Sequence, residues 1–332
     1  MPIAEFAPPR WLSNPHVQSL LATTRLRKAF IDSAALNAAS QWVMLDCGDG
    51  VRLLASHAIQ GDATPDTPLV IMIHGWEGSS ESAYLVSAAS ALYRAGAEIV
   101  RLNLRDHGDT HHLNEDLFHS CRLDEAVGAV RAIAERNPGR PLYLVGWSLG
   151  GNFAVRITDR APGAGVTLAH TVAVSPVVNP ANSFNAMNNG MFFYRYYFVR
   201  KWQRSLRRKQ QAFPAKYDFA EVLRMNDLHT MTAHLIGRYG EFANVEDYFD
   251  AYALDRGMLE GAKTPLTVIT AADDPVIPGQ DFAPYESRGN FTLEVLPHGG
   301  HCGFMERVGA HSWIDQRLCH TIIEKHRIGL NS

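Results

Sequence analysis

The sequence contains only four cysteines, and no two of them are spaced as a C-x-x-C pair. They are Cys47, Cys121, Cys302 and Cys319. A zinc knuckle or a disulfide framework requires cysteines that are grouped along the chain, so this scatter argues against both kinds of site. Isolated thiols are typical of a reducing compartment, and the sequence therefore predicts a cytoplasmic location.

The sequence also lacks a marked excess of charge, with 31 basic and 34 acidic residues and a formal net charge of −3. This balance gives no general attraction to nucleic acid, which is not expected as a partner. No stretch of membrane-spanning length is free of charged residues, and residues 1–14 contain no apolar run long enough for a signal peptide. The apolar fraction of 46% still allows a large core in a chain of 332 residues.

The most informative stretch of the sequence runs from Pro141 to Thr158. Residues 142–145 form a short apolar run of strand type, and residues 152–158 have a pattern compatible with a helix. Between them, Gly146-Trp-Ser-Leu-Gly150 matches the G-x-S-x-G elbow, in which a nucleophilic serine stands on a sharp turn from strand to helix. The alternative is a glycine-rich turn with an ordinary serine. The strand before and the helix after favour Ser148 as a nucleophile.

Alternation of strands and helices predicts the fold class along most of the chain. Gly48-Asp-Gly50 separates two strands of a predicted hairpin. An uninterrupted apolar strand follows at 69–73, and further strands are predicted at 98–104, 142–145, 166–174, 267–270 and 291–296. Helices are predicted between several of these strands, at 82–94 and 123–136, and a closing helix at 312–325. This order is typical of an α/β fold with a mostly parallel, doubly wound sheet covered by helices on both faces.

Two segments lie outside this alternation. Residues 1–40 are predicted to be an irregular arm with one helical piece. Residues 178–262 are mostly helical in character and contain seven aromatic residues between Phe192 and Trp202. We expect residues 178–262 to fold as a lid over the carboxyl edge of the sheet, with residues 41–177 and 263–332 as the core. The aromatic residues would then line an acyl-chain pocket, pack a small core of the lid, or do both.

A serine hydroxyl needs a base to remove its proton, and an acid to orient that base. Both occur in the required order, in loops that follow predicted strands. Asp273 and Asp274 follow the strand at 267–270, and His298 and His301 follow the strand at 291–296. Since these loops lie at the carboxyl ends of their strands, both can reach Ser148. The residue types alone do not choose between the two aspartates or between the two histidines.

The chain resembles the α/β-hydrolase fold in the order of three motifs: Gly146-x-Ser-x-Gly150, Asp274-Pro-x-x-Pro278 and Gly300-His-x-Gly-Phe304. More narrowly, Asn14-Pro-His16, His74-Gly-Trp-Glu-Gly-Ser79 and Asn103-Leu-Arg-Asp-His-Gly108 resemble the YheT-type branch, a group of bacterial esterase-like proteins related to eukaryotic abhydrolase-domain lipid hydrolases. This resemblance implies a sheet of α/β-hydrolase type with a helical lid insertion, and no cofactor or metal.

The resemblance also implies a role for each site residue. Ser148 would be the nucleophile, His301 the base, and Asp274 the acid that orients His301, because the spacing of both loops matches these positions better than Asp273 or His298. The backbone N–H groups of Trp76 and Leu149 would hold the oxyanion. Position 76 often carries a smaller aliphatic residue in this branch, so the tryptophan leaves the shape of the neighbouring pocket open.

Two further patterns have competing interpretations. The stretch Asp106-His-Gly-Asp-Thr-His-His112 resembles a set of metal ligands, but a polar loop after the strand at 98–104 explains it better. Residues 183–217 contain eight lysines and arginines and no acid. They would form either a face for peripheral contact with anionic lipid or a solvated helix surface, and the second interpretation is favoured.

The sequence therefore predicts a serine hydrolase that acts on a small-molecule carboxylic ester. Short-to-medium acyl chains are expected, and one form of the hypothesis is that the ester derives from a lipid. An acyltransferase with the same three residues is one alternative. A binding protein that has kept the fold without activity is another, although it would have no need of all three residues. Dehalogenases and epoxide hydrolases are disfavoured because their nucleophile is an aspartate and position 148 is a serine. The oligomeric state is not predicted.

Overall fold

The computed structural model describes residues 5–307, 309 and 312–330. Residues 1–4 of the predicted arm and residues 308, 310–311 and 331–332 of the predicted core lie outside the described residues. At the centre of the molecule is an eight-stranded sheet with the strand order β1-β2-β4-β3-β5-β6-β7-β8. Its strands are β1 (Ser40–Asp46), β2 (Arg52–Ala58), β3 (Leu69–Ile73), β4 (Glu98–Leu102), β5 (Leu142–Trp147), β6 (Leu168–Val174), β7 (Leu266–Ala271) and β8 (Phe291–Leu296).

The sheet is parallel from β4 to β8, and only the β1–β2 and β2–β4 pairs are antiparallel. The β1–β2 pair is the predicted hairpin, and its turn contains Gly48, Asp49 and Gly50, all with positive φ. This strained turn suits glycine, and it sets the register that pairs Asp46 with Arg52. The prediction of a mostly parallel α/β sheet is confirmed.

Helices cover both faces of the sheet because successive side chains of a buried strand point to opposite faces. On β3, Ile71 and Ile73 belong to one core with α5 (Leu123–Arg136) and α6 (Leu149–Arg160). Val70 and Met72 belong to a second core with α4 (Ala83–Arg94) and α12 (Trp313–Cys319). Strands that are apolar on both faces therefore require helices on both faces, as the uninterrupted apolar runs indicate.

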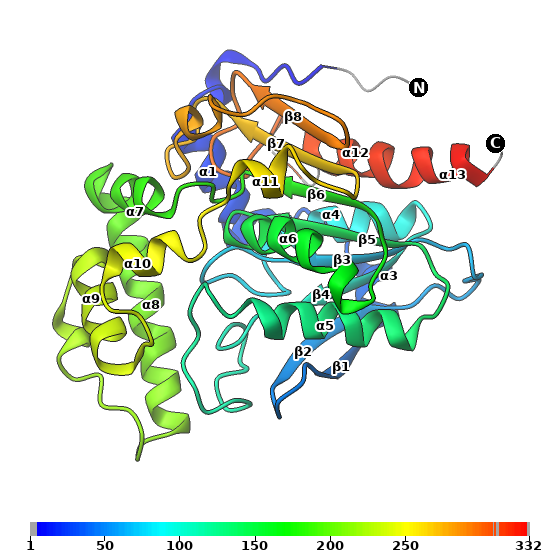
Figure 1. Cartoon of the computed structure of the whole chain (residues 1–332). Helices are drawn as coiled ribbons and strands as arrows, with labels where there is room; N and C mark the ends of the chain where they lie inside the picture. Colours follow the sequence, from blue (N-terminus) through cyan, green and yellow to red (C-terminus); the bar gives the residue numbers. More distant parts are fainter. Residues whose placement is uncertain (1–4, 308, 310–311, 331–332) are drawn as a thin grey trace.

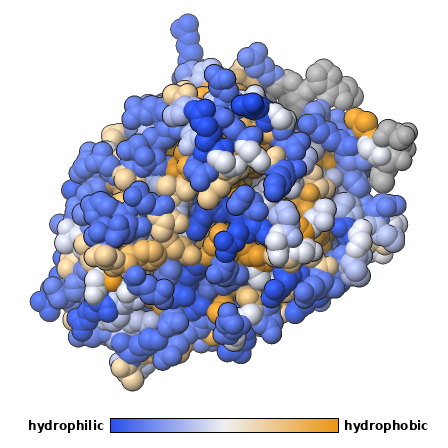
Figure 2. Space-filling view, in the orientation of Figure 1, coloured by the Kyte–Doolittle hydropathy of each residue, from blue (hydrophilic) through white to orange (hydrophobic). Residues whose placement is uncertain are grey.

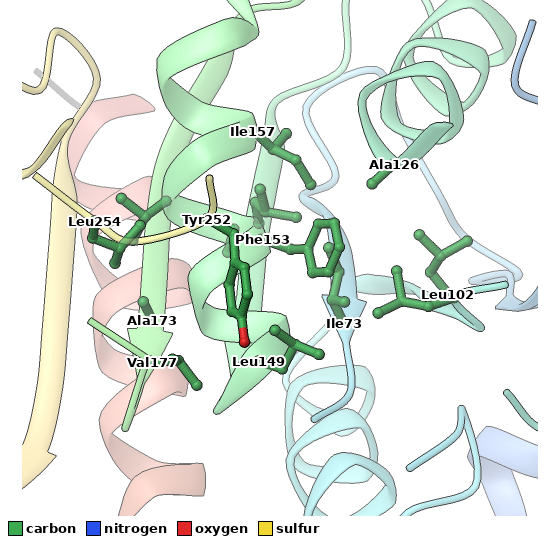
Figure 3. Close-up of a cluster of buried hydrophobic side chains, with 14 of the residues drawn as sticks. Ile73, Leu102, Ala126, Leu149, Phe153, Ile157, Ala173, Val177, Tyr252 and Leu254 are labelled. Atoms are coloured by element: carbon green, nitrogen blue, oxygen red, sulfur yellow. The ribbon is translucent and has the colours of Figure 1, made fainter. Parts of the chain in front are cut away.

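Five α-helices and one 3-10 turn (Val222–Arg224) lie between β6 and β7. The α-helices are α7 (Pro180–Asn189), α8 (Phe192–Ala212), α9 (Leu228–Tyr239), α10 (Val245–Asp250) and α11 (Arg256–Leu259). Helices α7 to α10 gather at one side of the core, at the left of Figure 1. The chain then returns past α6, where Tyr252 and Leu254 belong to the same buried cluster as Leu149 and Val177 (Figure 3). The N–H of Leu254 also donates to the carbonyl of Val178 at 3.0 Å, and this bond joins the beginning of the inserted segment to its end.

The two ends of the chain differ from expectation. The arm has three short helices rather than one helical piece: α1 (Pro15–Thr23), α2 (Arg25–Lys28) and α3 (Ala34–Ala39). Such short helices carry little periodicity and depend on packing, here against α4. The closing helix is longer than predicted, because a π-helical turn at His320–Glu324 joins α12 to α13 (Lys325–Leu330).

The surface is mostly polar. Figure 2 shows one face of the molecule, on which hydrophilic residues predominate and apolar residues form smaller patches. Within the described part of the chain, no helix combines the length and the apolar character that crossing a bilayer requires.

Candidate active site

Ser148 stands on the sharp turn between β5 and α6 with φ 54° and ψ −120°. Glycines on both sides make this turn sterically feasible. A Cβ at Gly146 would lie 2.0 Å from the carbonyl oxygen of Gly150, and a Cβ at Gly150 would lie 2.4 Å from the carbonyl oxygen of Ile73. A non-glycine residue in this backbone region is strained, and the surrounding packing must maintain it. The turn therefore presents the Ser148 hydroxyl above the carboxyl edge of the sheet.

The structure brings Ser148, His301 and Asp274 together in a single chain of hydrogen bonds. His301 Nδ1 lies 2.9 Å from Asp274 Oδ2, and His301 Nε2 lies 3.0 Å from Ser148 Oγ. Because the carboxylate can only accept, Nδ1 carries the proton and Nε2 accepts from the serine hydroxyl. The other carboxylate oxygen of Asp274 accepts the N–H groups of Val276 and Ile277 at 2.8 and 2.9 Å, which fixes its orientation.

The neighbouring aspartate and histidine have different partners. Asp273 accepts the N–H of Gly300 at 2.9 Å, and its other oxygen lies 3.3 Å from Nδ1 of His298. His298 is exposed, and among the described residues no hydrogen bond joins it to Ser148. Geometry thus separates the two adjacent aspartates: Asp274 contacts the imidazole of His301, whereas Asp273 contacts the backbone of the same loop.

The environment of His301 shifts its pKa in two directions. Burial acts to lower the pKa of the imidazole, but the Asp274 carboxylate with its hydrogen bond, together with Cys302, outweighs this effect and holds the pKa well above its ordinary value. The positive charge that would form on His301 is therefore stabilised by its neighbour, which suits a group that takes up a proton during a reaction.

The loop after β3 lies directly above Ser148. A Cβ at Gly75 would be 3.1 Å from the Cβ of Ser148. Position 75 therefore accepts a residue larger than glycine only if its neighbours shift slightly. The Tyr84 hydroxyl accepts the N–H of Gly75 at 2.9 Å. His74 accepts the N–H of Leu104 at 3.2 Å through Nε2 and donates to the Gly75 carbonyl at 2.8 Å through Nδ1. These bonds fix the turn that precedes Trp76.

The two predicted oxyanion donors are the backbone N–H groups of Trp76 and Leu149. Leu149 is the first residue of α6, where the N–H groups of a helix have no partner in the helix itself. Within the described residues, neither of these two N–H groups donates to a protein acceptor. Both therefore remain available beside Ser148, at the positive end of the α6 dipole.

The Trp76 side chain connects this loop to the helices inserted between β6 and β7. Its ring stacks on Phe198 with centroids 5.4 Å apart and an interplanar angle of 11°. It also meets the edge of Trp202 at 5.1 Å and lies 5.8 Å from Phe184. In addition, the ammonium of Lys201 donates to the carbonyl of Glu77 at 3.0 Å. Helices α7 and α8 thus rest on the loop next to Ser148.

A cavity of about 1400 Å³ opens between these helices and the sheet edge and contains Ser148 and His301. Its lining includes Trp76, Phe184 and Met187, so one part of the wall is apolar. The N-terminal helix α1 contributes a further part of the lining, through Ser19, Leu20 and Thr23. The candidate site is therefore enclosed by three segments that lie far apart in the sequence.

The residues that resembled metal ligands have other partners. Asp106 accepts from Lys209 and from the N–H of Phe118, both at 2.8 Å. His107 Nδ1 contacts the Arg105 carbonyl at 2.7 Å, and burial lowers the pKa of His107 to about 4. No group of three or more His, Cys, Asp and Glu side chains among the described residues is arranged to hold a metal ion. The stretch at 106–112 is a loop that contacts helix α8.

The basic residues of α8 are not all on a solvated surface. Lys209 is fully buried, which contradicts the favoured interpretation for that residue. Arg208 pairs with Asp109 at 2.6 Å, and Lys216, just beyond the helix, pairs with Asp116 at 2.7 Å. The acidic partners come from the loop after β4, about a hundred residues earlier in the chain. Sequence reasoning found no acid near these residues because it considered only one segment.

Sequence reasoning also missed the role of α1. The helix begins at Pro15, and the Asn14 side chain caps it by accepting the N–H groups of His16 and Val17 at 2.9 and 3.2 Å. The helix itself is the helical piece predicted for the arm, and an asparagine followed by proline is a standard helix-start signal. Its contacts with the loop of His301, formed by Gln18 and Ser19, have no local signal.

Comparisons with known proteins identify the family of the fold. The sequence profile of the alpha/beta hydrolase fold matches residues 68–308. The chain is 24% identical over 320 residues to the Escherichia coli (strain K12) protein named "Putative esterase YheT", which covers 95% of this chain and 92% of that protein. It is 24% identical over 268 residues to a monoacylglycerol lipase of Saccharomyces cerevisiae, with 76% of this chain and 58% of that protein covered. The predicted resemblance to the YheT-type branch is confirmed.

Solved structures show the same fold. A serine hydrolase from Cycloclasticus zankles is similar with a TM-score of 0.57 and 17% identity, over 85% of this chain and 97% of that chain. An esterase from Pyrococcus furiosus is similar with a TM-score of 0.53 and 15% identity, over 98% of both chains. At such identities the likeness concerns the fold alone.

Proposed function

The chain belongs to the alpha/beta hydrolase fold family, and we propose that it is a serine esterase that cleaves carboxylic esters through an acyl-enzyme intermediate. The observation that carries the proposal is the hydrogen-bonded chain from Ser148 through His301 to Asp274, with distances of 3.0 and 2.9 Å. A strained, glycine-flanked serine whose base is in turn oriented by a buried acid is the arrangement that activates a hydroxyl for attack.

In the first half-reaction, Ser148 Oγ attacks the ester carbonyl carbon while its proton passes to His301 Nε2. The carbonyl oxygen becomes an oxyanion, which accepts from the N–H groups of Trp76 and Leu149. Collapse of this intermediate breaks the bond to the alcohol oxygen, and His301 gives its proton to the departing alcohol. Asp274 stabilises the imidazolium throughout.

In the second half-reaction, a water molecule gives its proton to His301 and attacks the acyl group on Ser148. The same N–H groups hold the second oxyanion. Its collapse returns the proton to Ser148 and releases a carboxylic acid. Each cycle therefore consumes one ester and one water, produces one alcohol and one acid, and leaves the three side chains as they began.

The substrate is an ester with a short-to-medium acyl chain that is lipid-derived. The support is the cavity of about 1400 Å³ beside Ser148, together with its partly apolar lining. Residues 178–262 act as the lid of this pocket, because α7 and α8 pack on Trp76. The exposed aromatic residues Phe192 and Tyr196, beside Arg195 and Arg200 on α8, provide a peripheral contact for an anionic lipid surface. Four free cysteines support a cytoplasmic location.

An activity-based fluorophosphonate probe tests the assignment of the nucleophile. The wild-type protein should be labelled at Ser148, and Ser148→Ala should abolish labelling while leaving the unfolding temperature unchanged. Ser79→Ala and Ser80→Ala are the matched controls, since both serines lie in the loop above the site, and both variants should label at the wild-type rate. Labelling that persists in Ser148→Ala would overturn the proposal.

A further inference from the structure

The loop that carries His301 has an unusual backbone. Four of its residues have positive φ: Gly299 at 149°, Gly300 at 54°, Cys302 at 60° and Phe304 at 48°. Two of these are not glycine, so the loop is strained and must be held in place by its surroundings. Its only internal backbone bonds among the described residues run from the N–H groups of Gly303 and Phe304 to the Gly299 carbonyl.

One outside anchor of this loop is the Trp313 N–H, which donates to the Phe304 carbonyl at 2.9 Å. Among the described residues, the remaining backbone anchors come from two other segments. Asp273 accepts the N–H of Gly300 at 2.9 Å, as described above. Helix α1 provides the others. Gln18 is fully buried, accepts the N–H of Met305 at 2.7 Å and donates to the Met305 carbonyl at 2.9 Å. The hydroxyl of Ser19 accepts the backbone N–H of His301 itself at 2.8 Å.

Ser19 is buried, with an exposed fraction of 5%. Its own proton goes to the Pro15 carbonyl at 2.7 Å, so the oxygen that faces His301 can only accept. The side of α1 that carries it is pressed against the loop. A Cβ at Gly300 would lie 2.3 Å from the Pro15 carbonyl oxygen and 2.9 Å from Ser19 Oγ, and a Cβ at Gly303 would lie 2.7 Å from Gln18 Oε1. Helix α1 and the loop are therefore packed closely against each other at Gly300 and Gly303.

We propose that Ser19 is a positioning residue for His301: its hydroxyl fixes the backbone from which the imidazole reaches both Asp274 and Ser148. The expected effect on the reaction rate rests on the proposed function, in which His301 is the base. The inference goes beyond that function because it makes the N-terminal helix a part of the active site. Catalysis requires the base within a few tenths of an ångström of its productive position. Loss of this one acceptor should therefore act on the rate through His301, although Ser19 does not touch the substrate carbonyl.

The test compares Ser19→Ala with the wild type in three measurements. The rate constant for fluorophosphonate labelling of Ser148 and kcat should each fall roughly five- to tenfold, the factor expected from one hydrogen bond, whereas KM should change little. The proton on His301 Nδ1 should broaden or shift in the NMR spectrum as its bond to Asp274 loosens. Ser13→Ala is the matched control, because that hydroxyl donates only to carbonyls of the arm, at 3.4 and 3.2 Å, and does not line the cavity.

Ser19→Cys is a second variant that keeps the size of the side chain but replaces the hydroxyl with a poor acceptor, so it remains informative if Ser19→Ala does not fold. A reduced labelling rate and an altered His301 proton at an unchanged unfolding temperature support the inference. Wild-type labelling rates in both folded variants would overturn it. If the wild-type protein is not labelled at Ser148, the proposed function fails, while the His301 proton still reports on the position of the imidazole.

Discussion

Lys209 and Asp106 form an ion pair that is closed off from solvent, with Nζ 2.8 Å from Oδ1 and the lysine side chain fully buried. The ammonium also donates to the carbonyls of Asn114 and Asp116 at 2.6 and 2.9 Å, so all three of its protons have acceptors. Burial raises the pKa of Asp106 and lowers that of Lys209, and their mutual attraction opposes both shifts. The pair joins helix α8 to the loop after β4.

We expect Lys209→Met to lower the free energy of unfolding by about 3–5 kcal/mol, because it leaves a buried carboxylate without its cation. Arg208→Met is the matched control. Arg208 pairs with Asp109 at a similar distance, 2.6 Å, but both side chains are exposed, and such pairs contribute about 1 kcal/mol or less. Denaturant unfolding of the two variants measures the difference. Equal decreases in the free energy of unfolding for the two variants would show that burial of the Lys209–Asp106 pair does not determine its contribution to stability.

The two adjacent aspartates should differ sharply in their effect on the reaction. Asp274→Asn should lower kcat on the order of 10³- to 10⁴-fold, as loss of the orienting acid does in serine triads. Asp273→Asn should cost less than tenfold, since an amide oxygen can still accept the N–H of Gly300. Steady-state kinetics on a p-nitrophenyl ester gives both values. If Asp273→Asn is the more damaging change, the roles of the two residues must be exchanged.

The pH dependence of kcat/KM should have an acid limb above pH 6.5. His301 accepts a proton only when it is neutral. Asp274 and Cys302 together outweigh the effect of burial and raise the pKa of His301 well above 6.5, so activity is lost as the pH falls through that raised value. In Asp274→Asn the limb should move to lower pH, because burial then dominates.

Glu77 provides the control for this profile. It lines the same cavity, and burial raises its pKa to about 7, so it titrates in the same range. Glu77→Gln should leave the acid limb in place if His301 is the group observed. A limb that disappears in Glu77→Gln and persists unchanged in Asp274→Asn would assign it to Glu77.

The preference for acyl chains should follow the size of the cavity. Each buried methylene contributes about 0.8 kcal/mol, so two more carbons should raise kcat/KM roughly tenfold until the pocket is full. Phe184→Ala should move the optimum of a p-nitrophenyl ester series to longer chains, because Phe184 lines the cavity beside Trp76. Phe192→Ala is the control, since that ring is 75% exposed and does not line the cavity. A steady fall in kcat/KM from acetate upward would show that the aromatic residues leave no acyl pocket.

Much of this protein follows from the sequence, because the signals are local. A turn from strand to helix with a strained residue at its centre needs glycine on both sides. Gly146 and Gly150 meet this requirement within a stretch of five residues, so the turn can be recognised from the sequence. Strands that are apolar on both faces imply helices on both faces, which is why residues such as Val70 and Ile71 predict the doubly wound sheet. The bounds of β3, α5 and β8 accordingly match the prediction.

Tertiary structure alone decided the rest. Asp273 and Asp274 are identical in type and adjacent, and the sequence favoured Asp274 only through the Asp-Pro-x-x-Pro spacing of a resembled family. The position of the β7 loop relative to His301 is what shows which carboxylate the imidazole contacts. The contact between Ser19 and His301 joins residues 282 positions apart, and that between Lys209 and Asp106 joins residues 103 positions apart. Such contacts leave no periodicity or spacing in the chain, because they depend on how complete elements pack against each other, and packing is set by the whole core rather than by any one segment.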